Sequence, residues 1–339
     1  MTGQILGGRY RILKFLGQGG FAETYIAEDI HLPDRPQHVV KKLQPLGANG
    51  APPDPAVLQI ARRLFDREAK VLYQLGNHDR IPKLLAHFQE SQEFYLVQEF
   101  IEGQDLSSEI CPGKVLTEEA VIDLLRSSLE VLVFVHQHDT IHRDIKPSNL
   151  IRRASDGRIV PIDFGAAKQI SSKIAIALGQ AAPTVIGTPG YMPKEQELGK
   201  PELSSDIYAL GMTAIQALTG VLPGQLPTDA DGEIIWQNRA RVSNKIAAIL
   251  SKMVRYDYRQ RYPSAIEVLE ALDALDPRVA SVTKKSTKPK KSNRLTLWLS
   301  LLALLFATAA LGITITAIVS GSGFIAPKQP REQNRDWEW

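Results

Sequence analysis

The stretch IHRDIKPSNLI at positions 141–151 constrains the chain more than any other part of its sequence. Its two ends are apolar and its centre is polar, and Pro147 prevents a continuous helix. We therefore predict a loop that is anchored at both ends. The centre of this loop offers one carboxylate, two cations and one amide, from Asp144, Arg143, Lys146 and Asn149.

This set of side chains suits phosphoryl transfer. A carboxylate can accept the proton of a hydroxyl, a cation can neutralise phosphate charge, and an amide oxygen can bind a hard metal ion. The stretch resembles the catalytic loop of protein kinases, H-R-D-x-x-x-x-N, at each defined position. The resemblance implies that Asp144 accepts the substrate proton, Lys146 stabilises the transferred phosphoryl group and Asn149 binds metal. A polar surface loop is the alternative, so the other parts of a kinase must be found along the chain.

Composition limits the classes of protein to consider. A chain of 339 residues can form about two lobes with additional segments. Its net charge of +3 comes from a basic run at 284–294, so we expect no nucleic-acid partner. The single cysteine, Cys111, excludes a disulfide framework within one chain and suits a reducing compartment. The first ten residues lack the apolar core of a signal peptide.

A glycine-rich turn follows an alternating strand at 10–15. Glycine lets a backbone approach phosphates closely, although an ordinary hairpin would have the same pattern. No helix follows the glycines, which excludes a Rossmann fingerprint. The turn resembles the kinase pattern G-x-G-x-x-G-x-V, with Ala22 and Thr24 replacing its last two defined residues. The resemblance implies that ATP contacts Leu16, Gly17, Gln18, Gly19, Gly20, Phe21, Ala22, Glu23 and Thr24.

Two lysines, Lys41 and Lys42, end the next apolar strand. Strand alternation places only one of them on the nucleotide face. The position in the kinase motif favours Lys41 for the α- and β-phosphates, with Val39 beside the nucleotide. A helix is predicted over 56–75 from the spacing of its apolar residues. By resemblance, Glu68 of this helix is the partner of Lys41.

The strand at 94–101 resembles the segment that joins the two kinase lobes, with Gln98 at the gatekeeper position. The resemblance implies that the backbones of Glu99 and Ile101 bind the adenine edge. It also implies that Asp105 reaches the ribose and that Ile151 contacts the nucleotide.

A helix over 117–139 should lead into the catalytic loop, because its apolar residues line one face and Thr117 can cap it. The strand at 159–165 ends in Asp-Phe-Gly, which in kinases makes Asp163 the second metal ligand with Asn149. Residues 166–186 match an activation loop. The candidate phosphorylation sites in this loop are Ser171, Ser172 and Thr184.

The segment GTPGYMPKE at 187–195 resembles the end of a kinase activation loop, with Pro193 and Lys194 as departures. The resemblance implies a buried ion pair between Glu195 and Arg261. It also implies that Asp206 holds the catalytic-loop backbone.

Together these parts imply an α+β fold of two lobes. A small antiparallel β lobe with one helix covers 1–101, and a larger, mainly α lobe covers 102–279. Lys146 is typical of serine/threonine kinases. The sequences of several motifs are similar to those of bacterial, Hanks-type kinases, cyanobacterial ones in particular. The expected cofactors are ATP and Mg²⁺, with Mn²⁺ as an alternative. The expected partners are proteins with Ser or Thr hydroxyls and a second copy for trans-autophosphorylation.

The C-terminal part has a different composition. Residues 280–294 form a basic juxtamembrane linker, and 295–319 are apolar and uncharged. This length can cross a hydrocarbon layer of about 30 Å, so we predict a transmembrane helix in contact with lipid. The basic flank predicts that the kinase domain is cytoplasmic and that 320–339 form a short extracytoplasmic tail of a single-pass cell-membrane protein.

Two other functions remain open at this level. The departures at Ala22, Pro193 and Lys194 leave room for a pseudokinase that acts by contact. Alternatively, the chain could be a membrane adaptor whose tail does the work.

Overall fold

The computed structural model describes residues 1–19, 22–43, 55–91, 93–164 and 190–275. The predictions for Gly20, Phe21, Ser171, Ser172 and Thr184 fall outside these ranges, as do those for 280–339. Within the described ranges, no helix combines the length and apolarity that a membrane span requires.

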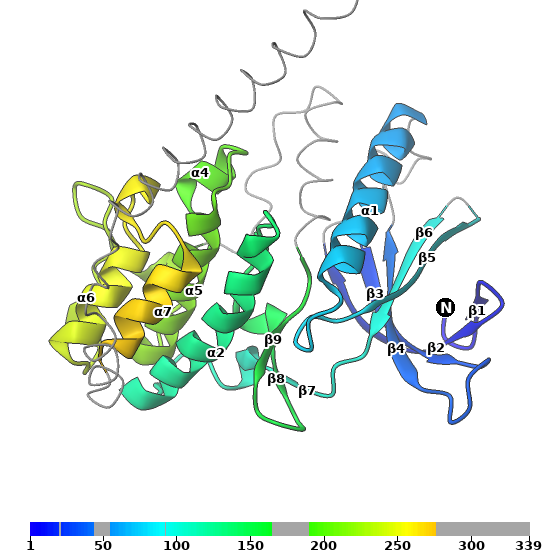
Figure 1. Ribbon diagram of the computed structural model, residues 1–339, viewed down its shortest axis with the longest axis horizontal. Coiled ribbons are helices and arrows are strands. Elements are labelled where there is room, and N and C mark those ends of the chain that lie inside the picture. Colours follow the sequence, from blue (N-terminus) through cyan, green and yellow to red (C-terminus); the bar gives the residue numbers. More distant parts are fainter. Residues whose placement is uncertain (20–21, 44–54, 92, 165–189, 276–339) are drawn as a thin grey trace, which may run out of the picture. The chain divides into compact units, whose positions relative to one another are not determined.

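The N-terminal lobe is built on one antiparallel sheet of six strands in the order β1-β2-β3-β4-β6-β5 (Figure 1). Neighbours in the chain pair as hairpins, apart from β4, which pairs with β6. The strands are β1 (Ile5–Leu6), β2 (Tyr10–Gly19), β3 (Ala22–Asp29), β4 (Gln37–Leu43), β5 (Leu84–Glu90) and β6 (Glu93–Glu99).

Alternation along the strands gives this sheet two apolar faces. Val40 and Val97 are cross-strand partners on the face that the N-terminal residue Leu6 covers. Leu43 and Phe94 are partners on the opposite face, which packs against helix α1 (Pro55–Leu75). Helix α1 lies alongside the sheet in Figure 1 and agrees with the helix predicted over 56–75.

The larger lobe is mainly helical. Its helices are α2 (Glu118–Gln137), α4 (Lys194–Glu197), α5 (Leu203–Thr219), α6 (Asn244–Met253) and α7 (Ala265–Asp273). Thr117 caps α2 as predicted, since its hydroxyl accepts a hydrogen bond from the N–H of Ala120.

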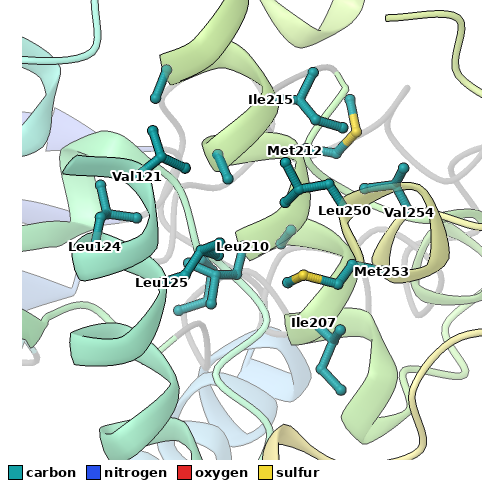
Figure 2. Close-up of a cluster of buried hydrophobic side chains, with 14 of the residues drawn as sticks. Val121, Leu124, Leu125, Ile207, Leu210, Met212, Ile215, Leu250, Met253 and Val254 are labelled. Carbon is teal, nitrogen blue, oxygen red and sulfur yellow. The ribbon is translucent and has the colours of Figure 1, made fainter. Parts of the chain in front are cut away.

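Helix α5 runs through the core of this lobe and is buried along almost its whole length. Its apolar side chains meet those of α2 and of the end of α6 (Figure 2). Gly211 allows the close approach to α6, because a Cβ there would lie 2.7 Å from a methyl of Val254. The core labelled in Figure 2 consists of Val121, Leu124, Leu125, Ile207, Leu210, Met212, Ile215, Leu250, Met253 and Val254.

A second sheet has three strands in the order β7-β8-β9, of which β7 precedes α2 in the chain and β8 and β9 follow it. Its strands are β7 (Gly103–Asp105), β8 (Leu150–Arg153) and β9 (Ile159–Pro161). Short 3₁₀ turns connect the elements of this lobe: η2 (Leu106–Ser108), η3 (Pro147–Asn149), η4 (Pro223–Gln225), η5 (Gln237–Arg239) and η6 (Tyr258–Gln260).

The stretch 141–151 is a loop from the end of α2, through η3, into β8, as its apolar ends and polar centre predicted. The α+β prediction of a small antiparallel lobe with one long helix and a larger helical lobe is confirmed for the described residues.

Candidate active site

The backbone of the loop at 141–151 is held by the carboxylate of Asp206 on α5. The N–H groups of His142 and Arg143 each donate to it at 2.8 Å, and His136 Nε2 lies 3.0 Å from it. Burial alone would raise the pKa of Asp206, but the hydrogen bond from His136 and the nearby backbone donors lower it below its ordinary value. The predicted bracing role of Asp206 is confirmed.

Asp144 lies at the centre of the site, with a mostly buried side chain. The amide nitrogen of Asn149 donates to the carboxylate of Asp144 at 2.8 Å and to its backbone carbonyl at 2.9 Å. The Nζ of Lys146 lies 3.5 Å from the same carboxylate. One carboxylate, one amide and one of the two cations of the loop thus converge, as the residue types of this loop and its resemblance to the kinase motif predicted.

The two lysines at the end of β4 lie on opposite faces of the sheet. Lys41 is opposite Leu96 and forms an ion pair with Asp163, whereas Lys42 is opposite Tyr95 and its Nζ lies 2.7 Å from Glu93. Alternation therefore directs Lys41 alone toward the site. Burial alone would lower the pKa of Lys41, but the charges of Asp163 and Glu68 raise it above its ordinary value.

Glu68 on α1 is buried near Lys41. Lys41 forms an ion pair with Asp163. Among the described residues, Glu68 forms no ion pair within 4.0 Å. Burial raises the pKa of Glu68 to about 7, against the opposing charge of Lys41. The structure thus brings Lys41, Glu68 and Asp163 together. The direct partner of Lys41 is Asp163, whereas Glu68 was predicted.

Asp163 follows strand β9 and has a backbone φ of +62°, an uncommon conformation for a residue with a side chain. The next residue, Phe164, is buried between α1 and α2, and its ring lies 4.5 Å from that of His142. Burial alone would raise the pKa of Asp163, but the ammonium of Lys41 lowers it below its ordinary value. The buried phenyl ring fixes the backbone from which this carboxylate projects.

The predicted nucleotide-contacting residues of the N-terminal sheet differ in the face on which they lie. Val39 and Thr24 lie on the Lys41 face of the sheet, since Thr24 is the cross-strand partner of Lys41. The side chain of Glu23 accepts a hydrogen bond from Tyr25 at 2.7 Å, so it belongs to the opposite face and only its backbone could contact a nucleotide. The remaining described members of the glycine-rich turn, Leu16, Gly17, Gln18, Gly19 and Ala22, form the adjoining ends of β2 and β3.

The end of β6 and the segment that follows it offer mainly backbone groups. The N–H of Glu99 donates to the carbonyl of Lys83 at 2.9 Å, so of its two backbone groups only the carbonyl could face a ligand. Ile101 is buried, and Ile151 pairs with Asp105 across β7 and β8. One oxygen of Asp105 caps η2 through the N–H of Ser107.

The residues present fit a hard cation shared with phosphate. Asp163 offers a carboxylate, and Asn149 offers its amide oxygen because its amide hydrogens are directed at Asp144. In the part of the chain that the structure describes, no group of three or more His, Cys, Asp or Glu side chains forms a metal cage. A site with two protein ligands is typical of Mg²⁺, which takes its other ligands from water and phosphate.

A second, buried ion pair stabilises helix α4, which lies beside the catalytic loop. Arg261 Nη1 lies 2.7 Å from Glu195 of α4, both side chains are buried, and the hydroxyl of Ser205 donates to the same carboxylate at 2.7 Å. The predicted Glu195–Arg261 pair is confirmed. A buried carboxylate in such a pair keeps α4 in place, because its separation would leave an uncompensated charge.

Two further residues beside the loop were not found from the sequence. The charge of Arg67 on α1 acts on Arg143, whose pKa is lowered first by burial and then by this second cation. The amide of Gln196 on α4 donates to the carbonyl of Arg143 at 2.8 Å. Neither residue belongs to a motif used above, so only the tertiary structure could reveal them.

Comparisons with known proteins agree with this geometry. Residues 10–275 match the family described as protein kinase domain. The chain is 45% identical over 273 residues to the serine/threonine-protein kinase PknA of Nostoc sp., which covers 79% of this chain and 48% of the relative. It is 42% identical over 273 residues to the serine/threonine-protein kinase B of Synechocystis sp., which covers 79% of this chain and 47% of the relative. The chain therefore spans about half the length of these relatives.

The fold is also that of solved structures. The crystal structure of the Mycobacterium tuberculosis PknI kinase domain superposes with a TM-score of 0.61 at 22% identity, over 83% of this chain and 99% of that one. This likeness confirms the fold.

The opposite faces of the two lysines lead to a prediction. Lys41→Met should abolish phosphoryl transfer, since it removes the cation beside Asp163. Lys42→Met should keep most of the transfer rate and lose stability instead, because it leaves the Glu93 carboxylate without its buried partner. Transfer rates and denaturant midpoints of both variants provide the measurement. An inactive, stable Lys42→Met beside an active Lys41→Met would contradict the assignment.

Proposed function

The chain belongs to the protein kinase family, and we propose that it is a serine/threonine protein kinase that transfers the γ-phosphate of ATP to hydroxyl groups of proteins. The observation that carries this proposal is the convergence of Asp144, Lys146 and Asn149 with the Lys41–Asp163 pair. Lys146 and the names of the relatives support serine and threonine as acceptors.

In the proposed reaction, Asp144 orients the acceptor hydroxyl and receives its proton, because its carboxylate is fixed by Asn149. Lys146, 3.5 Å from this carboxylate, neutralises charge on the transferred group. Bound ATP and Mg²⁺ would supply the phosphoryl group and a cation held by Asp163 and Asn149. Lys41 would then exchange Asp163 for phosphate oxygens and Glu68, which lies buried nearby. Most of the catalysis is thus positioning and electrostatics.

We also propose that the chain is anchored in the cell membrane with its kinase domain in the cytoplasm. The support is the uncharged, apolar sequence at 295–319 and the basic linker at 280–294 that precedes it. The compact unit at 1–281 contains the whole candidate active site, so the anchor is separable from the chemistry.

One experiment tests the activity and the anchor together. Residues 1–280 should be soluble without detergent and should transfer phosphate from ATP with Mg²⁺ to Ser and Thr of a generic basic protein. Asp144→Asn in the same fragment should slow the transfer by about 10²–10⁴-fold, because the proton acceptor is lost while the shape is kept. The full chain should sediment with membranes.

A fragment that binds ATP but transfers no phosphate would contradict the proposal and favour a pseudokinase. A fragment that requires detergent would contradict the separable anchor.

We further propose that phosphorylation of the segment after Asp163 controls activity. Arg143 is half-buried beside a second cation, Arg67, and among the described residues its Nε has no hydrogen-bond partner. A phosphate could accept a bidentate pair from such a guanidinium and would relieve the repulsion between the two cations. Thr184 is the favoured acceptor, with Ser171 and Ser172 as alternatives. Transfer from a second copy of the chain would explain how this phosphate is added.

This control predicts a measurable pattern. A phosphate map after incubation with ATP and Mg²⁺ should place phosphate between 166 and 186, at a rate that rises with protein concentration. Thr184→Ala and Arg143→Ala should each lower the transfer rate about tenfold, since a charge-assisted hydrogen bond is worth about 1.5–3 kcal/mol. Arg259→Ala is the matched control, because Arg259 is an exposed arginine that pairs with Asp257. Full activity of Thr184→Ala with no phosphate in this segment would exclude the mechanism.

A further inference from the structure

The backbone next to the catalytic carboxylate is in an uncommon conformation. Arg143 has a φ of +68°, in the left-handed region where a side chain collides with the backbone. Such a residue persists only where the surrounding contacts determine its conformation. Its N–H is one of the groups held by Asp206. The contacts of the carbonyl group of Arg143 therefore determine how firmly the next residue, Asp144, is held.

The peptide unit between Arg143 and Asp144 is fixed at both of its polar ends. Its oxygen accepts from Nε2 of Gln196 at 2.8 Å, and its N–H donates to Nδ1 of His142 at 3.3 Å. A peptide unit is planar, so fixing its oxygen and its N–H fixes the whole plane. The Cα of Asp144 is one corner of this plane. The direction of its side chain thus depends on the hydrogen bond from Gln196.

Gln196 is itself held in place. It lies on α4 next to Glu195, which forms the buried pair with Arg261. Its N–H donates to the carbonyl of Pro193 at 3.1 Å, which completes the turn. A small space of about 10 Å³ beside it is lined by Arg143, Asp144, Ile145, Tyr191, Met192 and Ala209. That volume holds no more than about one water molecule, so solvent has little room to replace the amide at the carbonyl.

We propose that Gln196 is a positioning residue for phosphoryl transfer: its side-chain amide holds the carbonyl of Arg143 and thereby sets the direction of the Asp144 carboxylate. The inference rests on the proposed kinase function and deepens it. The Glu195–Arg261 pair then affects catalysis as well as stability, because it fixes the helix that carries this amide. Gln196 needs no contact with the substrate in this role.

The chemistry of the contact defines the variants. Gln196→Leu keeps the approximate size but cannot donate a hydrogen bond. Gln196→Glu keeps the shape and can donate only while its carboxyl group is protonated, and partial burial beside a carbonyl oxygen would raise the pKa of that group. Gln237→Leu is the matched control, since it removes a similar hydrogen bond, from Gln237 to the hydroxyl of Ser251 at 2.9 Å.

Steady-state kinetics of the full chain with ATP, Mg²⁺ and a basic protein substrate test the inference. Gln196→Leu should lower kcat about tenfold, while the KM for ATP stays within about twofold, because the nucleotide contacts are untouched. Gln237→Leu should keep the wild-type kcat. The kcat of Gln196→Glu relative to wild type should rise as the pH falls from about 8 to about 6, as the carboxyl group regains its proton.

The results separate this inference from the proposed function. A wild-type chain without transfer activity contradicts the proposed function and the positioning role with it. An active wild type with an unchanged kcat in Gln196→Leu contradicts the positioning role alone. Equal losses in Gln196→Leu and Gln237→Leu, or a pH-independent ratio for Gln196→Glu, would show that Gln196 only stabilises the fold.

Discussion

The arrangement of the site depends on the buried carboxylate of Asp206. It accepts two backbone N–H groups of the catalytic loop and lies against His136, so it joins α5 to the end of α2 and to the loop that follows α2, which lie 63 to 70 residues earlier in the chain. Helix α5, which carries it, is packed on α2 and α6 through the core of the larger lobe. Any displacement of Asp206 would therefore disturb that core. The loop is held by a helix that is buried along almost its whole length, and the left-handed Arg143 is tolerated for that reason.

Much of the fold and part of the site could be predicted because the relevant signals are local. Strand alternation shows that only one of Lys41 and Lys42 faces the site, the position in the kinase motif favours Lys41, and Thr117 marks the start of α2. The Glu195–Arg261 pair and the role of Asp206 are long-range contacts, and they were found only through resemblance to a family. Their residue types alone would have indicated solvated charges.

The remaining contacts could not be predicted from the sequence, for physical reasons. The direct partner of Lys41 depends on the position of α1 relative to the Asp-Phe-Gly backbone, and no spacing rule determines that position. The contact from Gln196 to Arg143 requires a left-handed residue and a four-residue helix to meet. The side chain of Glu23 faces away from the site because of its register with Lys42, although its motif position had placed it among the nucleotide contacts.

The raised pKa of Glu68 makes the stability of the fold and the choice of partner for Lys41 depend on pH. In the folded chain this carboxyl group keeps its proton up to about pH 7, whereas its ordinary pKa is 4.5. Between these values the folded state binds more protons than the unfolded state, so this group makes the free energy of unfolding decrease as the pH rises. An exchange of partners that brings Lys41 to Glu68 would favour the charged carboxylate and release the proton. The heat of that exchange would then vary with the ionisation enthalpy of the buffer, and the balance between the two arrangements of Lys41 would shift with pH near neutrality.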